Sequence, residues 1–145
     1  MTKLTENFTL EEMTFSETAS RKGWDNTPPK EAQDNLVRVA LLLEQVRKII
    51  NRPIIVNSGY RCKELNEAIG SKETSQHRKG AACDFKVKGM TPDQVVKAIV
   101  ASDIQYDQLI REFDSWVHIS VPNDIYLTPR NQTLIIDKLG TRSYS

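Results

Sequence analysis

The chain contains only two histidines, His77 and His118, and an aspartate, Asp84, follows the first of them by seven residues. A neutral imidazole and a carboxylate are both good ligands for zinc. A catalytic zinc site needs three protein ligands and one open position, at which a water molecule is acidified and becomes a nucleophile. We therefore expect these three residues to hold one Zn²⁺ per chain.

The strands expected around two of these residues orient them alike. Residues 81–87 and 116–121 carry apolar side chains at every second position, and side chains alternate between the two faces of a strand. Asp84 and His118 therefore both lie on the face opposite the apolar residues. Taken singly, each has an ordinary alternative: a loop histidine is usually a solvated surface residue, and Asp84 could pair with Lys86 or cap a turn.

The residues around the three expected ligands form a longer pattern. The stretch from Ser75 to Asp84 fits SxHxxGxAxD, and it is accompanied in order by SGYR at 58–61 and WVHIS at 116–120. These motifs resemble those of the zinc D-alanyl-D-alanine carboxypeptidases and dipeptidases, and of phage endolysins, which share their fold with the hedgehog signalling domain. The resemblance spans roughly residues 30–121, and several ordered motifs are far more specific than one.

The resemblance implies a zinc-dependent peptidase that hydrolyses a peptide bond in bacterial peptidoglycan, with the stem peptides as partners. Two bonds stay open: the terminal D-alanyl-D-alanine bond of a carboxypeptidase, and an internal bond such as the L-alanyl-D-glutamate bond of an endopeptidase. A phage or prophage lysis enzyme, or a lytic component of a virion, is consistent with the chain. Two rival interpretations are a non-catalytic binding or structural module stabilised by zinc, and a cytoplasmic dipeptidase with a narrow closed pocket.

Arg61, in the SGYR motif, is implied by the resemblance to act on the substrate. Its planar guanidinium is suited to binding a carboxylate or to stabilising the oxyanion of a tetrahedral intermediate. The alternative is a surface salt bridge with Glu64 or Glu67. We expect Tyr60, beside Arg61, to contact the substrate, and Ser75 either to orient a ligand or only to cap the loop.

Peptide hydrolysis also needs a general base, and here the chain departs from the family pattern. Many relatives have an acidic residue three positions before the last histidine, where this chain has Ser115. A three-residue hairpin loop after Glu112 would place that carboxylate opposite Trp116 and on the histidine face, whereas a two-residue loop would bury it unpaired. We therefore expect Glu112 as the base, Asp114 as the fallback, and Trp116 as a wall of the cleft.

The rest of the sequence predicts the elements that carry these residues. We expect an N-terminal helical flap over residues 1–27, with Phe8, Leu10, Met13 and Phe15 lying against the body, a core over 28–138 and a frayed tail over 139–145. A long helix is expected to begin at Thr27, Pro28 and Pro29, since proline is tolerated in a first turn. Its apolar stripe recurs at steps of three and four: Leu36, Val39, Ala40, Leu43, Val46 and Ile50.

Shorter elements follow the long helix. The sequence predicts a buried strand at 54–56, a short helix within 62–69, a polar loop to residue 79, the strand at 81–87, a hairpin, and a last strand near 133–138. A second helix opens at Thr91 and Pro92, and its expected buried side is Val95, Val96, Ile99 and Val100. This order predicts an α+β domain, hedgehog-like by resemblance, with helices on one face of a mainly antiparallel sheet and the zinc site on the other.

Composition and charge indicate the number of domains and the classes of partner. With 145 residues and 39% hydrophobic content, we expect one domain, and a net charge of +1 argues against nucleic acid as a partner. The start of the chain lacks the apolar stretch of a secretory signal, so we expect cytoplasmic synthesis, and action on the cell wall after release or within a virion. We expect a monomer that does not bind membranes, with Cys62 and Cys83 as free core thiols rather than a disulfide.

Overall fold

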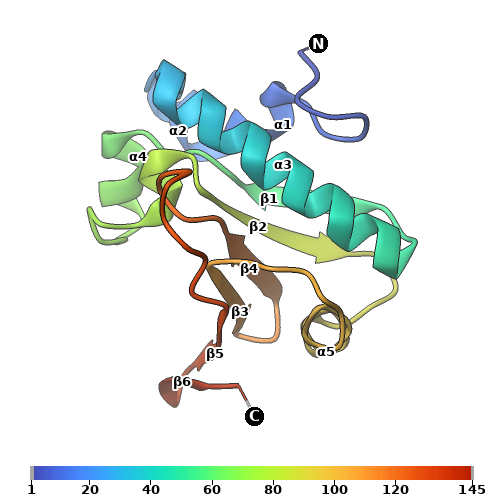
Figure 1. Cartoon of the computed structure of the whole chain (residues 1–145). Coiled ribbons are helices and arrows are strands. Elements are labelled where there is room, and N and C mark those ends of the chain that lie inside the picture. Colours follow the sequence, from blue (N-terminus) through green and yellow to red (C-terminus); the bar gives the residue numbers. More distant parts are fainter. Residues whose placement is uncertain (1, 145) are drawn as a thin grey trace.

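The central element of the fold is a six-stranded mixed sheet. The computed structural model describes residues 2–144. The strands are β1 (Ile54–Ser58), β2 (Ala82–Val87), β3 (Gln108–Glu112), β4 (Trp116–Ser120), β5 (Gln132–Asp137) and β6 (Gly140–Ser143). They are arranged in the order β1-β2-β4-β3-β5-β6, and every neighbouring pair is antiparallel except β3 and β5 (Figure 1). The expected α+β class with a mainly antiparallel sheet is confirmed.

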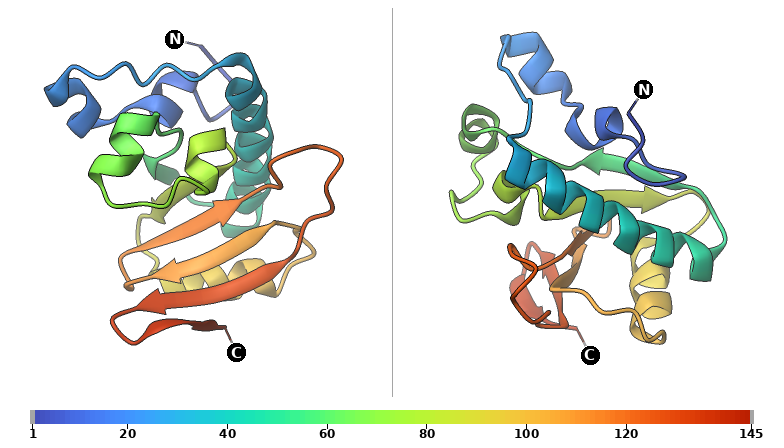
Figure 2. Two further views of the ribbon diagram at one scale, coloured as in Figure 1. Left: turned by 90° about the vertical axis from the view of Figure 1, so that its left-hand side faces the viewer. Right: turned by 45° about the horizontal axis from the view of Figure 1, so that its top comes forward.

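The helices divide between the two faces of this sheet. They are α1 (Leu10–Thr14), α2 (Glu17–Lys22), α3 (Lys30–Ile50), α4 (Lys63–Ala68), α5 (Pro92–Val100) and the 3₁₀ helix η1 (Gln76–Lys79). In the left view of Figure 2, α3 and α5 lie behind the sheet, whereas α4 and η1 lie on its near side. The two long helices therefore bury one face of the sheet. The expectation that the helices all lie on that face is wrong, because α4 and η1 lie on the face that carries the site, where η1 supplies His77.

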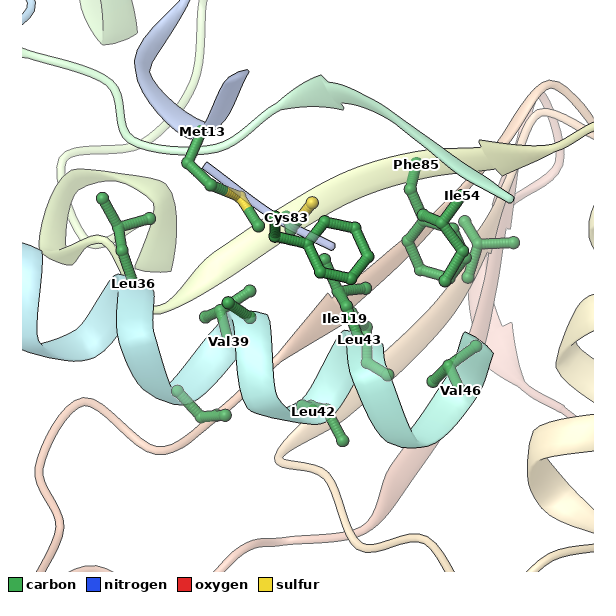
Figure 3. Packing of buried hydrophobic residues seen from close by; sticks show 14 of the residues in the cluster. Met13, Leu36, Val39, Leu42, Leu43, Val46, Ile54, Cys83, Phe85 and Ile119 are labelled. Carbon is green, nitrogen blue, oxygen red and sulfur yellow. The ribbon is translucent and has the colours of Figure 1, made fainter. Parts of the chain in front are cut away.

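The core forms between α3 and the sheet. The apolar stripe of α3 packs against the inward face of β2 and β4, as the spacing predicted (Figure 3). Each fully buried leucine, valine or phenylalanine contributes about 1.5–3 kcal/mol relative to leaving it exposed. The side chains that form the centre of this interface include Leu36, Val39, Leu43, Val46, Cys83, Phe85 and Ile119.

Three local predictions about these elements are wrong. The helix starts at Lys30, with Pro29 at the cap position and no side-chain cap, so Thr27 does not begin it. Ile55 is exposed, because β1 is an edge strand whose outward face has no covering layer. Val100 is also exposed, since it lies in the last turn of α5 beyond the buried residues that α5 contributes to the core.

The N-terminal segment is tied closely to the body of the protein. Phe8 and Met13 are buried in the main core, whereas Phe15, which was expected to lie against the body, is exposed. The backbone of Tyr60 donates a hydrogen bond of 2.8 Å to the carbonyl oxygen of Met13. The side chain of Asn26 donates to the carbonyl of Thr14 at 2.7 Å and to that of Tyr60 at 3.1 Å. The N-terminal segment and the SGYR turn are thus held together by a main-chain hydrogen bond and by the side chain of Asn26.

A glycine is required at position 59 because there is no space for a side chain, not because of the backbone conformation. A Cβ at this position would overlap the carbonyl oxygen of Met13 and would lie 3.0 Å from its carbonyl carbon. Both are backbone atoms, which cannot rotate away as a flexible side chain can. The chain therefore approaches α1 here at a distance that only glycine permits.

Gly59→Ala is expected to destabilise the protein by about 2–3 kcal/mol, because overpacking against backbone forces the N-terminal segment to move. Urea unfolding monitored by circular dichroism measures this loss. Gly70→Ala is the control: its Cβ would meet nothing within 4 Å, so only the strain of its φ of 77° remains, about 1 kcal/mol. Equal losses in the two variants would show that the close approach to Met13 is unimportant.

The C-terminal residues do not form the frayed tail that was expected. Gly140–Ser143 form β6, which pairs with β5. Asp137 and Arg142 join the two strands through hydrogen bonds of 2.8 and 2.9 Å, and these lower the pKa of Asp137 to about 2. An exposed polar hairpin of this kind has no apolar alternation, so the sequence pattern could not indicate it.

Two further expectations concern the cysteines and membranes. Cys62 and Cys83 are both buried and both free, as expected. Across residues 2–144, no helix has the length and apolar character needed to cross a bilayer.

Candidate metal centre

His77, Asp84 and His118 converge on the open face of the sheet. One ligand atom from each lies within 4.8 Å of the other two, and all three side chains are buried. The Oδ1 atom of Asp84 lies 3.3 Å from Nε2 of His77 and 2.9 Å from Nδ1 of His118. The two imidazole rings meet edge to face, with centroids 5.2 Å apart. The structure thus brings together the three residues that the sequence singled out.

The strands position two of these side chains by register. Asp84 of β2 and His118 of β4 are direct cross-strand partners, so their side chains emerge side by side on one face. Burial alone would raise the pKa of Asp84, but the two imidazoles, through charge and hydrogen bonds, outweigh it and hold that pKa well below its usual range. Lys86 is exposed and does not pair with Asp84, so the salt-bridge alternative is wrong.

The 3₁₀ helix η1 and the SGYR turn at residues 58–61 position the side chain of His77. Ser75 caps η1, and its hydroxyl accepts a hydrogen bond of 3.3 Å from the backbone of His77. The ring Nδ1 of His77 lies 2.7 Å from the carbonyl oxygen of Gly59, so Nδ1 carries the hydrogen and Nε2 is left as the ligand atom. Burial lowers the pKa of His77, which favours the neutral imidazole that a metal requires.

This arrangement fits a zinc ion. Two atoms bound tetrahedrally at about 2.1 Å from zinc lie about 3.4 Å apart. The separations of 2.9 and 3.3 Å around Asp84 are close to that value, so small rotations of the side chains would complete the site. Two nitrogen donors and one carboxylate oxygen form a donor set typical of catalytic zinc, and one carboxylate leaves the ion a net positive charge.

Arg61 lies against the metal cluster rather than on the surface. Its Nη2 atom is 3.3 Å from Oδ2 of Asp84, and its Nε donates to the hydroxyl of Ser58 at 3.2 Å. Only 11% of its side chain is exposed. The alternative of a surface salt bridge with Glu64 or Glu67 is therefore wrong.

Glu112 reaches the same cluster from the end of β3. The hairpin has the three-residue loop that was expected, with Glu112 opposite Trp116. Its Oε1 atom lies 3.9 Å from Nδ1 of His118. Burial raises the pKa of Glu112, and the negative charge of Asp84 raises it further. A carboxylate with a raised pKa beside a metal cluster is a candidate for proton transfer.

Asp114, the fallback base, lies away from the cluster. It occupies the left-handed region at φ 50° in the hairpin loop, and 71% of its side chain is exposed. It pairs at 3.1 Å with Arg111, which also binds Asp93 of α5 on the opposite face of the sheet. Asp114 is thus a turn residue. Ser115 is also a turn residue, since its hydroxyl donates a hydrogen bond to the carbonyl oxygen of Phe113 in the same loop.

Trp116 forms an aromatic pair at the edge of the cluster. Its ring centroid lies 6.1 Å from that of Phe113, which is exposed and adopts a positive φ of 53°. Among residues 2–144, the buried indole nitrogen of Trp116 has no hydrogen-bond partner. A bulky residue at positive φ is uncommon and marks a strained loop.

Sequence reasoning missed a polar network behind η1. The buried carboxylate of Asp107 binds the guanidinium of Arg130 through contacts of 3.0 and 2.6 Å and also accepts from the Arg130 backbone. Gln76, next to His77, donates to Asp107 at 3.1 Å and to the carbonyl of Val121 at 2.9 Å. The network joins η1 to the loop between β4 and β5. Its members are 31 and 23 residues apart, so no local spacing could have indicated it.

Asp107→Asn is expected to lower the free energy of unfolding by about 1–3 kcal/mol at pH 7, since it weakens several charge-assisted hydrogen bonds. Arg130 lowers the pKa of Asp107, so the parent keeps this stabilisation above the ordinary aspartate pKa and loses it as the pH falls through the lowered value. Urea unfolding at pH 7 and near pH 3 checks both statements. Asp137→Asn, in the exposed Asp137–Arg142 pair, should cost much less than Asp107→Asn because solvent screens an exposed pair, and equal costs would contradict the importance of burial.

The family assignment follows from a match that covers most of the chain. A family model described as peptidase M15 matches residues 6–120. The chain belongs to the peptidase M15 family. This is the zinc D-alanyl-D-alanine peptidase family that the motifs resemble, and its members are zinc-dependent metallopeptidases. No curated protein gives a significant match. The M15 match begins within the N-terminal segment and ends with β4, so it includes all the residues of the cluster.

Proposed function

We propose that this M15 chain is a zinc peptidase that hydrolyses a peptide bond in the stem peptides of bacterial peptidoglycan, on a D-alanyl-D-alanine-peptidase or hedgehog-like fold. The observation that carries the proposal is the position of Glu112. Its carboxylate lies 3.9 Å from Nδ1 of His118 in the three-residue metal cluster, and Arg61 contacts Oδ2 of Asp84 in the same cluster. A site that only stabilised the fold would need neither group.

The residues of the site divide the chemistry between them. His77, Asp84 and His118 would hold a zinc ion, which would supply Lewis-acid polarisation of a carbonyl and would acidify a water molecule. Glu112 takes the proton from the attacking water and returns it to the leaving amine, and its raised pKa suits both transfers. The guanidinium of Arg61 stabilises the negative charge that develops on the carbonyl oxygen.

The finer proposals concern the bond and the biological setting. Cleavage of the terminal D-alanyl-D-alanine bond or of an internal bond such as L-alanyl-D-glutamate is compatible with the same cluster. We propose a phage or prophage lysis role, with action on the cell wall after release or from a virion. Ser115, at the position where relatives have an acid, keeps a non-catalytic module as the alternative, but Glu112 beside the cluster favours an enzyme.

The function is tested by incubating the zinc-loaded protein with purified peptidoglycan and, separately, with free D-alanyl-D-alanine. Mass spectrometry of the new termini is expected to show a single kind of cleaved peptide bond in peptidoglycan. Release of terminal D-alanine indicates a carboxypeptidase, and a new amino terminus within the stem indicates an endopeptidase. Cleavage of the free dipeptide alone would support a dipeptidase, and no cleavage of either substrate would support the non-catalytic module.

A further inference from the structure

The turn at residues 58–61 contacts His77 at two points. The carbonyl oxygen of Gly59 lies 2.7 Å from Nδ1 of the His77 ring, and the backbone N–H of Arg61 donates to the carbonyl oxygen of His77 at 3.0 Å. The first contact fixes the rotation of the ring, and the second fixes the backbone that carries it. The direction in which Nε2 of His77 points therefore depends on where this turn lies.

The side chain of Asn26 holds this turn on both sides of Arg61. Its Nδ2 donates to the carbonyl oxygen of Tyr60 at 3.1 Å, and its Oδ1 accepts from the backbone N–H of Cys62 at 2.7 Å. Asn26 lies in the loop between α2 and α3, which is 34 and 36 positions away from these two partners. Because the turn lies beyond the end of β1, Asn26 supplies here the pairing that a neighbouring strand supplies to β1.

The same carboxamide also binds the N-terminal segment. Its Nδ2 donates to the carbonyl oxygen of Thr14 at 2.7 Å, and the preceding carbonyl, that of Met13, accepts from the backbone N–H of Tyr60 at 2.8 Å. The side chain of Met13 is buried in the main core, which anchors this end of α1 (Figure 3). The turn is therefore held from the core through the N-terminal segment, and Asn26 joins the two.

The three partners of Asn26 need a side chain with both a donor and an acceptor. Two carbonyl oxygens require a donor and one backbone N–H requires an acceptor, and a carboxamide offers both. These partners also fix which end of the carboxamide is nitrogen. Aspartate would keep the bond to Cys62 but would place an oxygen against the carbonyl oxygens of Thr14 and Tyr60. Alanine would remove all three hydrogen bonds.

We propose that Asn26 is a positioning residue for the metal centre, which orients the imidazole of His77 as a zinc ligand by holding the turn at residues 58–61. Asn26 lies outside the three-residue cluster and acts only through the turn. Loss of a group that orients a metal-binding histidine typically lowers metal affinity by about 10–100-fold. The N-terminal segment thus contributes to zinc affinity as well as to the core.

The zinc affinity of the folded protein tests this proposal without any hydrolysis. Competition with a chromophoric chelator at pH 7 gives Kd, and Asn26→Ala and Asn26→Asp are each expected to raise Kd about 10-fold or more. The visible spectrum of the cobalt(II)-substituted protein depends on the geometry of the ligands, so it should change in both variants. Circular dichroism and urea unfolding of the zinc-free proteins measure separately how far each substitution destabilises the fold.

Asn7→Ala is the matched control for these variants. Nδ2 of Asn7 donates to Oε1 of Glu44 on α3 at 2.7 Å. This variant therefore also removes a side-chain hydrogen bond of the N-terminal segment, but it leaves the turn at residues 58–61 untouched. Its Kd for zinc and its cobalt spectrum should match those of the parent.

The outcomes separate a positioning role from a purely structural one. A folded Asn26→Ala or Asn26→Asp protein with the Kd and the cobalt spectrum of the parent would overturn the proposal, even if it were less stable. An equal loss of zinc affinity in Asn7→Ala, or failure of both Asn26 variants to fold, would overturn it as well. A parent that binds zinc but cleaves no peptide would contradict the proposed function and leave this proposal standing, because neither measurement uses a substrate.

Discussion

Glu112→Gln is expected to lower kcat for hydrolysis of peptidoglycan peptides by about 10²–10⁴-fold, the range that general acid–base catalysis contributes. Glutamine keeps the shape of the side chain but cannot accept a proton. Because Glu112 lies 3.9 Å from His118 and is not one of the three clustered ligands, zinc content should stay at one ion per chain. Initial rates and metal analysis of the same preparation measure both quantities.

Asp114→Asn is the matched control for this prediction. Asp114 lies in the same hairpin but is exposed and bound to Arg111, so its loss should change kcat less than about twofold. If Asp114→Asn abolished activity while Glu112→Gln retained it, the assignment of the base would be reversed. If neither variant affected the rate, proton transfer by this hairpin would be excluded.

His77→Ala is expected to abolish stoichiometric zinc binding and with it all peptidase activity. A site with two protein ligands loses a large part of its affinity, and the carbonyl of Gly59 loses its imidazole partner. Zinc should raise the Tm of the parent protein, since a ligand that binds only the folded state stabilises it, and should not raise the Tm of the variant. Differential scanning fluorimetry with and without added zinc measures this difference.

Lys86→Ala provides the comparison for the metal-site variant. Lys86 lies on the same strand as Asp84, but it is exposed and outside the cluster, so zinc binding and activity should both be preserved. Treatment of the parent with a chelator should remove activity, and added zinc should restore it. A His77→Ala protein that still bound one zinc ion at the affinity of the parent would contradict the site.

Local patterns were sufficient to predict the parts of the site that depend on one strand or one turn. The alternation in β2 and β4 placed Asp84 and His118 on one face, and the cost of burying Glu112 selected the three-residue hairpin loop. The stripe on α3 likewise follows from helical periodicity alone. In these cases the physical preference lies within a few consecutive residues.

Contacts between distant segments could not be predicted in this way. The pairing of Arg61 with Asp84 depends on the register of β1 against β2 and on the bulge between Val56 and Ser58. The links from Gln76 to Asp107 and Val121 need η1 to pack against the start of β3 and the end of β4. Such contacts depend on how separate elements pack, and no spacing within the sequence records that packing.

Anomalous diffraction at the zinc edge from crystals of the zinc-loaded protein tests the central claim most directly. We predict one peak per chain, bounded by Nε2 of His77, a carboxylate oxygen of Asp84 and Nδ1 of His118. These atoms should each lie about 2.0–2.2 Å from the ion. A protein that retains zinc but shows its anomalous peak elsewhere, with no density among these three side chains, would contradict the account.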